Sequence, residues 1–373
     1  MNVQDLFEQF DIDFYTGVPD SKLKALCNYL ADTFGISRQH IIAANEGNCT
    51  ALAAGYHLAT GKIPLVYMQN SGIGNIVNPV ASLLSEKIYG IPCIFVVGWR
   101  GEPGVHDEPQ HIFQGEISER LLKDIGLYTI IITADKTVED FEREIVAAKN
   151  VLKEGKGVAF LVRKNGLSYD ARVEYTNPYS ILREEAIEEI VKVSGEDIIV
   201  STTGKASREL FEIRERNHQS HKYDFLTVGS MGHSSSIALG IALYKPNAKV
   251  WCVDGDGGAL MHMGSMAVIG SNAPKNMVHI VLNNEAHETV GGMPTVAGKV
   301  DFVKIAEGCG YPNVFSVSSL EDIKQVLHKA KNEERLTFIE VKCAIGSRND
   351  LGRPTTSAVE NKRVFMEYLQ TLN

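Results

Sequence analysis

The sequence lacks the features that mark several classes of protein. Its six cysteines are scattered without a CxxC pair, which favours structural, buried thiols in a reducing compartment. The longest apolar runs, such as IPCIFVVGW, are far shorter than the ~20 residues needed to span a bilayer. The N-terminal stretch MNVQDLFEQF has acidic residues where a signal peptide has basic ones. We therefore expect a cytoplasmic protein with no membrane partner.

Positive charge is also scarce. The formal net charge is −9, and no cluster of Lys and Arg stands out, which argues against nucleic acid as a partner. Any anionic ligand must then be held by local cations, a metal ion or backbone amides. A dinucleotide fingerprint is absent from YTGVPDSK after the first predicted strand, and TTGKAS lacks the upstream glycine of a P-loop. These absences leave a small molecule as the expected ligand.

Short β-branched runs alternate with helix-length amphipathic segments, which is typical of βαβ units and a parallel sheet. The predicted strands are FYTGV, IIAA, IPLVYM, PCIFVVG, YTIIIT and VAFLVR in the first half, and DIIVST, DFLTV, KVWCVD, MVHIVLN, NVFSV and TFIEVK in the second. Between the halves, KNGLSYDARVEYTNPYS is polar and turn-rich. We predict two doubly wound α/β domains, 1–165 and 183–373, with a linker at 166–182. Ligands of such sheets bind at the carboxyl ends of the strands.

The stretch VWCVDGDGGALMHMG runs a buried strand into two carboxylates and three glycines. A tight strand-to-helix turn explains Asp and Gly there. The alternative is that the backbone of Gly255, Gly257 and Gly258 approaches a phosphate while Asp256 holds a cation. Asn284 ends the next long apolar strand, 28 residues after Asp256, so both residues are expected on adjacent loops at one sheet edge. A carboxylate, an amide oxygen and a nearby carbonyl suit Mg²⁺ or Ca²⁺ bound to a phosphate.

This GDG…NN spacing resembles the fingerprint of the thiamine-diphosphate enzymes. The resemblance implies that thiamine diphosphate and Mg²⁺ are the cofactors. It implies that Mg²⁺ is bound by Asp256, by the side chain of Asn284 and by the carbonyl of Ala286, while Asp254 shapes the turn. It also implies that the first domain binds the pyrimidine ring of the cofactor and the second domain binds its diphosphate.

Other cofactor-binding residues follow from the same resemblance. Glu46 ends a predicted strand and opens a helix, where the helix dipole alone favours a Glu; in the family, a Glu at such a place hydrogen-bonds the pyrimidine N1′ and activates the cofactor. In TVGSMGHSSSIALG, Met231 corresponds to the apolar residue that props the bent cofactor, and the Gly229 carbonyl accepts from the 4′-amino group. Core packing is the alternative for Met231. His233 and the serines after it either line the diphosphate pocket or cap the next helix.

Five segments narrow the resemblance to the phosphonopyruvate decarboxylase family. They are TGVPDS, NEGN, VYMQNSGIGN, GWRGEPGVHDEPQH and LNNEAHETVGG, in matching order from Thr16 to Gly292. The implied reaction converts 3-phosphonopyruvate to phosphonoacetaldehyde and CO₂ in phosphonate (2-aminoethylphosphonate) biosynthesis. Decarboxylation of sulfopyruvate or another 2-oxo acid is the alternative. The family also implies a homodimer or higher homo-oligomer with active sites between subunits.

The phosphonate of such a substrate requires cations in this acidic chain. Arg100 follows a strand in GWRG, and its forked guanidinium matches phosphonate oxygens. A surface ion pair with Glu102 is the alternative. Ser21 follows Pro-Asp at a helix start and either contacts an anion or caps the helix. Three polar residues directly after a buried strand are also expected to face the substrate: Gln69, Asn70 and Ser71.

Three histidines are candidates for proton transfer or anion binding, because an imidazole titrates near neutral pH. They are His106 and His111 in the first domain and His287 beside the predicted metal ligands. For the two loop histidines a solvated side chain is the alternative. The family pattern has Lys where His106 stands and smaller or shorter residues near Glu285 and Glu288. These departures weaken the case for a direct substrate role at those positions.

Overall fold

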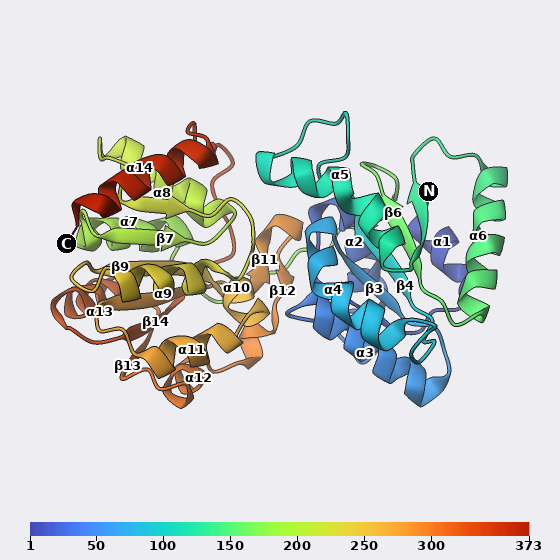
Figure 1. Cartoon of the computed structure of the whole chain (residues 1–373), viewed down its shortest axis with the longest axis horizontal. Coiled ribbons are helices and arrows are strands. Elements are labelled where there is room, and N and C mark those ends of the chain that lie inside the picture. Colours follow the sequence, from blue (N-terminus) through green and yellow to red (C-terminus); the bar gives the residue numbers. More distant parts are fainter. Residues whose placement is uncertain (373) are drawn as a thin grey trace. The chain divides into compact units, whose positions relative to one another are not determined.

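The computed structural model describes residues 1–372, apart from the side chains of Val138 and Thr289. The chain forms two compact units, labelled by element in Figure 1. The first comprises Met1–Tyr175 together with Thr289–Met293, and the second comprises Thr176–Glu288 and the residues from Pro294 onward. The division falls inside the predicted linker at 166–182.

All twelve predicted strands form, and they make two six-stranded parallel sheets. The first sheet contains β1 (Tyr15–Gly17), β2 (His40–Ile42), β3 (Leu65–Gln69), β4 (Ile94–Gly98), β5 (Tyr128–Ile132) and β6 (Val158–Val162). The second contains β7 (Ile198–Ser201), β8 (Asp224–Leu226), β9 (Val250–Gly255), β10 (Met277–Asn283), β13 (Asn313–Val317) and β14 (Thr337–Lys342). Two short strands that were not predicted, β11 (Ala286–His287) and β12 (Met293–Pro294), belong to neither sheet.

The two sheets share one topology. The first has the order β2-β1-β3-β4-β6-β5 and the second has β13-β14-β10-β9-β7-β8. When the strands are numbered within each unit, both orders become 2-1-3-4-6-5. The direction of winding reverses between the first and third strand of each unit, and ligands of open α/β sheets bind at that crevice. The predicted doubly wound fold is confirmed. A ligand is expected at the carboxyl ends of β1 and β3 in the first unit, and of β7 and β9 in the second.

Helices cover both faces of each sheet. In the first unit they are α1 (Val3–Glu8), α2 (Lys24–Phe34), α3 (Glu46–Thr60), α4 (Ile73–Pro79), α5 (Pro109–Asp124) and α6 (Val138–Lys153). Apolar residues of α1, α2 and α6 form one core with the sheet, while α3 packs against β1 and β3. This core also contains Val290 and Met293, from the segment that joins the first unit late in the sequence.

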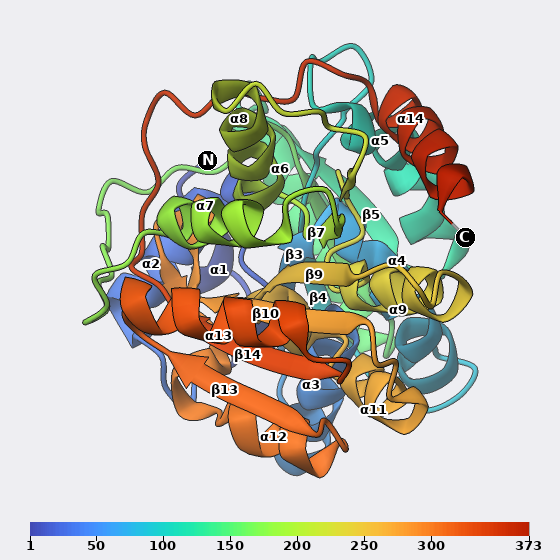
Figure 2. The same cartoon turned by 90° about the vertical axis from the view of Figure 1, so that its left-hand side faces the viewer.

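The helices of the second unit follow the same plan (Figure 2). They are α7 (Arg183–Ser194), α8 (Lys205–Arg216), α9 (Ser234–Tyr244), α10 (Asp256–Met261), α11 (Gly264–Asn272), α12 (Phe302–Gly308), α13 (Leu320–Asn332) and α14 (Ala358–Thr371). Along β9, Trp251 and Val253 pack with α7, α8 and α13, whereas Val250 and Cys252 pack with α9, α11 and α12. Alternate side chains of a strand point to opposite faces, so this continuous apolar run is buried on both sides.

The cysteines and the helices bear on the expectations drawn from composition. The six cysteines are unpaired thiols, and five are buried while Cys309 is partly exposed, so the predicted structural thiols are confirmed for the five. Among the described residues, every helix is too short or too polar to cross a membrane.

Candidate active site

Glu46 lies buried in the first turn of α3, directly after β2. The side chain of Asn45 caps this helix by accepting the amide of Gly47 at 2.7 Å, so the Glu46 carboxyl is free of that task. Its Oε2 accepts from Asn75 Nδ2 at 2.7 Å, and a Cβ at Gly72 would lie 2.5 Å from its Oε1. Burial raises the pKa of Glu46, and the bond from Asn75 opposes this rise only in part. A carboxyl in this environment suits the sharing of a proton with a nitrogen base.

Arg100 lies directly after β4 and is anchored by Asp107. Its Nε and Nη2 donate to the two carboxylate oxygens at 2.8 and 2.5 Å, while Nη1 lies 3.3 Å from Ser21 Oγ. Lys22 Nζ lies 3.9 Å from the same carboxylate. Burial alone would raise the pKa of Asp107, but Arg100 and two backbone amides hold it well below its usual range. Two cations therefore surround one ionised carboxylate at the carboxyl ends of β1 and β4.

Two alternatives considered for this region are wrong. Glu102 is buried and pairs with Arg163, so the surface ion pair between Glu102 and Arg100 does not form. Ser21 does not cap a helix, because the cap of the short 3-10 helix Ser21–Leu23 is the side chain of Asp20. Ser21 is exposed, and its hydroxyl faces Arg100.

The three polar residues after β3 have different surroundings. Gln69 Nε2 donates to Asp20 Oδ1 at 2.8 Å, and Ser71 Oγ donates to Gln69 Oε1 at 2.8 Å, which links the ends of β1 and β3. Asn70 is fully buried; its Nδ2 donates to the carbonyl of Arg100 at 2.8 Å, and its Oδ1 accepts the amide of Arg100 at 3.1 Å. Asn70 therefore fixes the backbone that carries Arg100, and a role in binding substrate stays a prediction.

The two loop histidines also differ. His106 is exposed, whereas His111 is partly buried in the first turn of α5. Burial and the nearby charge of Arg100 lower the pKa of His111, so its ring is neutral at pH 7 and suits proton transfer better than anion binding. The loop approaches α5 closely at Gly101, where φ is +65° and a Cβ would lie 1.8 Å from the carbonyl oxygen of His111. Only glycine fits that position.

Asp256 lies where β9 ends at Gly255 and α10 begins. Its side chain is buried, and Oδ2 accepts from Thr295 Oγ1 at 2.5 Å. Burial raises the pKa of Asp256 to about 7, although Thr295 and the amide of Gly257 act in the opposite direction. Asp254 is directed elsewhere: its Oδ1 accepts the amide of Gly255 at 2.8 Å. The prediction that Asp254 shapes the turn is confirmed.

Asn284 lies just beyond the end of β10, the strand next to β9 in the sheet. The 28-residue spacing therefore places Asp256 and Asn284 on adjacent loops at one sheet edge, as predicted. Asn284 is buried; its Oδ1 accepts the amide of Ala286 at 3.1 Å, and its Nδ2 donates to Glu288 Oε2 at 3.1 Å. A carboxylate, an amide oxygen and the carbonyl of Ala286 on these loops form the set of donors that hard cations prefer.

Met231 and His287 both lie close to Gly257. A Cβ at Gly257 would lie 2.9 Å from Met231 Cε and 3.7 Å from His287 Cε1, so the glycine makes this packing possible. Burial lowers the pKa of His287 to about 4, and its ring is therefore neutral at pH 7. Neither side chain belongs to a remote core, since both adjoin the loop that carries Asp256.

Gly229 and His233 lie on either side of a tight turn that precedes α9. Ser230 in this turn has φ of +58°, and Gly229 is partly exposed just before it. His233 is exposed and occupies the cap position of α9 without a capping hydrogen bond; its Nδ1 lies 3.2 Å from the carbonyl oxygen of Ser230. Helix capping by the His233 side chain, one of the two alternatives, is therefore wrong.

Four residues that support these groups were not found from the sequence: Lys22, Asn75, Asp107 and Thr295. Lys22 could have been predicted, because it directly follows Ser21, which was expected to bind an anion. The other three contact their partners across 29, 7 and 39 positions of sequence, and no local pattern indicates such a pairing.

Comparison with known proteins agrees with this geometry. Residues 3–122 match the N-terminal TPP-binding domain of thiamine pyrophosphate enzymes, and residues 202–341 match their C-terminal TPP-binding domain. The chain is 33% identical to a phosphonopyruvate decarboxylase of Streptomyces viridochromogenes, over 95% of this chain and 91% of that protein. A phosphonopyruvate decarboxylase of Streptomyces hygroscopicus is 34% identical, over 94% and 89% respectively. A sulfopyruvate decarboxylase of Methanosarcina acetivorans is 29% identical, over 98% and 96%.

The two domain matches fall in the first and the second half of the chain, as the resemblance implied. Relatives with this activity type align over nearly the whole length of both proteins. The resemblance based on the GDG…NN spacing is thereby confirmed. The chain belongs to the thiamine-diphosphate-dependent 2-oxo acid decarboxylases.

Proposed function

We propose that this protein decarboxylates 3-phosphonopyruvate to phosphonoacetaldehyde and CO₂, with uptake of one proton, and that Mg²⁺ accompanies thiamine diphosphate. The observation that carries the choice of substrate is the arrangement of Arg100. Two of its nitrogens are fixed on Asp107, the third faces Ser21, and Lys22 lies beside the same carboxylate. Two cations held at a sheet edge suit a phosphonate dianion in a chain of net charge −9. The relatives that are 33–34% identical support the same substrate.

The residues of the second unit fit Mg²⁺. Asp256 is a buried carboxylate whose only side-chain partner in the described residues is the hydroxyl of Thr295. A buried carboxylate is costly without a positive charge, so a divalent cation would stabilise its ionised form. We propose Asp256, Asn284 and the carbonyl of Ala286 as the metal ligands, and Gly255, Gly257 and Gly258 as the positions where the backbone approaches the diphosphate.

When bound, thiamine diphosphate supplies the electron sink for decarboxylation, and the protein supplies binding, orientation and proton transfer. We propose that Glu46 holds a proton at N1′ of the pyrimidine, for which its buried carboxyl is suited. Met231 provides an apolar support beside Gly257, with Gly229 and His233 on the neighbouring loop. His111 and His287, both neutral at pH 7, are the proposed residues for moving the proton that replaces CO₂.

The first test is a coupled assay for phosphonoacetaldehyde, run with and without added thiamine diphosphate and Mg²⁺. A second candidate is sulfopyruvate decarboxylation, because a sulfopyruvate decarboxylase aligns with 98% of this chain. Both substrates carry a tetrahedral anionic group, so they should be assayed in parallel. A higher kcat/KM for 3-sulfopyruvate would replace the proposed substrate.

Arg100→Ala should lower kcat/KM for phosphonopyruvate about ten- to hundredfold, since loss of a charge-assisted bond to a dianion costs roughly 1.5–3 kcal/mol. Pyruvate lacks the phosphonate and should be a poor substrate whose turnover scarcely changes. Steady-state kinetics with both substrates on both proteins gives the comparison. Arg163→Ala is the matched control, because Arg163 pairs with Glu102 of the same loop and is not proposed to meet the substrate.

An equal fractional loss for pyruvate and phosphonopyruvate would contradict this role of Arg100. Arg100 would then support the fold or the cofactor, and the phosphonate would have to be assigned to Ser21, Gln69 or Ser71. His106, which is exposed on the same loop, remains a proposed outer contact of the substrate.

We also propose that the smallest active species is a homodimer in which Glu46 of one subunit and Asp256 of the other serve the same cofactor. Equal mixing of inactive Glu46→Gln and Asp256→Ala proteins should then restore about one quarter of the wild-type activity, since half of randomly formed twofold dimers are mixed and each has one intact site. Activity is measured after subunit exchange has been verified by mass spectrometry. Each variant incubated with itself is the control, and no recovery in the mixture would show that the two residues act within one subunit.

A further inference from the structure

Two neighbouring asparagines end β10, and each is held by a glutamate. Asn283 Nδ2 donates to Glu340 Oε1 at 2.7 Å, and Asn284 Nδ2 donates to Glu288 Oε2 at 3.1 Å. In both residues the amide oxygen accepts a backbone amide two positions later in the chain. Because a primary amide has a donor side and an acceptor side, a carboxylate bound to its nitrogen determines where its oxygen points.

Glu288 is itself fixed by two cations. Arg183 Nη1 donates to its Oε2 at 2.6 Å, and Lys205 Nζ donates to its Oε1 at 2.6 Å. The remaining nitrogens of Arg183 bind both oxygens of Glu209 at 2.7 and 2.6 Å. The side chains of Arg183, Glu209 and Glu288 are only 10%, 1% and 9% exposed. A buried carboxylate with charged donors on both oxygens has little freedom to rotate, so its contact with Asn284 has a defined direction.

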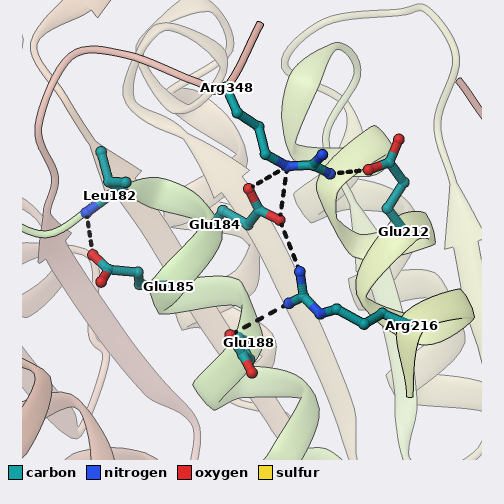
Figure 3. A pocket seen from close by; sticks show the side chains of 7 residues that line it. All are labelled: Leu182, Glu184, Glu185, Glu188, Glu212, Arg216 and Arg348. Carbon is teal, nitrogen blue, oxygen red and sulfur yellow. Dashed lines mark hydrogen bonds and ion pairs between the residues drawn. The ribbon is translucent and has the colours of Figure 1, made fainter. Parts of the chain in front are cut away.

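Lys205 is also held by the loop that follows β14. Lys205 Nζ also donates to Ser347 Oγ at 2.6 Å. The next residue, Arg348, binds Glu184 on α7 at 2.9 and 3.2 Å and pairs with Glu212 on α8. Arg348 lies beside a hollow whose lining is mostly charged, and the ion pairs of Arg348 and Arg216 cross it (Figure 3). The pairs of Arg348 with Glu184 and Glu212 hold the loop that carries Ser347, the residue that Lys205 contacts.

We propose that Glu288 is a positioning residue for Asn284: by holding the amide nitrogen, its carboxylate keeps the amide oxygen available to the metal ion. The inference rests on the metal site proposed above and extends it to a residue that does not touch the metal or the substrate. Outer-shell partners of this kind orient metal ligands, and their loss typically weakens metal binding about 10- to 100-fold.

Glu288→Gln is the sharpest test because the side chain keeps its size but loses one acceptor oxygen. The new NH₂ group must face a donor, either Lys205 or the pair on Arg183 and Asn284. The remaining oxygen is uncharged in both orientations, so the amide of Asn284 is held less firmly. The affinity for Mg²⁺, measured by calorimetry in the presence of thiamine diphosphate, should fall about 10- to 100-fold. Excess Mg²⁺ should restore cofactor binding and turnover, which it would not do for a fold defect.

Glu340→Gln is the matched control. It makes the same change beside Asn283, which is not a proposed ligand. Glu340 does not contact Asn284, so the affinity for Mg²⁺ should stay within about twofold of wild type. Glu288→Asp provides a second variant that keeps the charge between Arg183 and Lys205 but is too short to retain the contact with Asn284. It should show the same loss of Mg²⁺ affinity while its thermal unfolding stays near that of wild type.

Wild-type affinity for Mg²⁺ in both Glu288 variants would overturn the inference. A different result would overturn the metal site itself: wild-type protein that binds thiamine diphosphate equally well with and without Mg²⁺. The two failures are therefore distinguishable, and neither depends on which 2-oxo acid is the substrate.

Discussion

Asp256→Ala should remove Mg²⁺-dependent binding of thiamine diphosphate and, with it, decarboxylation. Asp256 is the only carboxylate among the three proposed ligands, and it is buried at the end of β9 with the hydroxyl of Thr295 as its neighbour. The metal contributes several kcal/mol of electrostatic stabilisation, so loss of its charged ligand should weaken binding at least about thousandfold. Calorimetry of cofactor binding, with and without Mg²⁺, measures this loss directly.

Asp254→Asn is the matched control for that experiment. Asp254 is a buried carboxylate of the same turn, and an asparagine there can still accept the amide of Gly255. Binding that depends on Mg²⁺ should therefore survive in the control. If Asp256→Ala binds the cofactor with wild-type affinity, the assignment of Asp256 as a metal ligand is wrong.

Glu46→Gln should have the second largest effect, and on a different step. A glutamine fits the space beside Gly72 and Asn75, so cofactor affinity should change little. It cannot exchange a proton with the pyrimidine N1′, and loss of such acid–base catalysis costs typically about 10²- to 10⁴-fold. The rate at which the C2 proton of bound thiamine diphosphate exchanges in D₂O, followed by NMR after acid quench, should fall by that factor.

The control for this measurement is Glu102→Gln, another buried carboxyl of the first unit, which pairs with Arg163. Its exchange rate should equal that of wild type. Unchanged exchange in Glu46→Gln would mean that Glu46 only begins α3, which was the simpler explanation of its position.

The fold was predictable because its signals are local and repeated. Each predicted strand is a short apolar run, and in the second sheet β9 and β10 are buried on both faces. The alternation with amphipathic helices then determines a parallel sheet, and a parallel sheet brings Asp256 and Asn284 to one edge. Strands β11 and β12 have two residues each, too few for a periodic pattern to be detected.

The positions of the candidate site residues were predictable mainly where the end of a strand fixes them. The partner of Arg100 was missed because the conformation of a loop decides it: Gly101 has φ of +65°, and the chain returns so that Asp107, seven residues away, meets the guanidinium. The bonds between the Asn70 amide and the backbone of Arg100 were missed in the same way, because the two residues lie on neighbouring loops 30 positions apart in the sequence. Such pairings depend on tertiary packing, which cannot be read from residue type and local spacing.

The core of the first unit includes Val290 and Met293, which lie far beyond Tyr175 in the sequence. During synthesis, ribosomes extend a chain at about 5–20 residues per second, and N-terminal domains generally fold first. Here the nascent N-terminal half emerges without two of its own core side chains. These side chains become available only after more than half of the second unit has been translated. Completion of its folding is therefore coupled to late translation, and an N-terminal fragment released early would expose an unfilled apolar surface of the kind that chaperones bind.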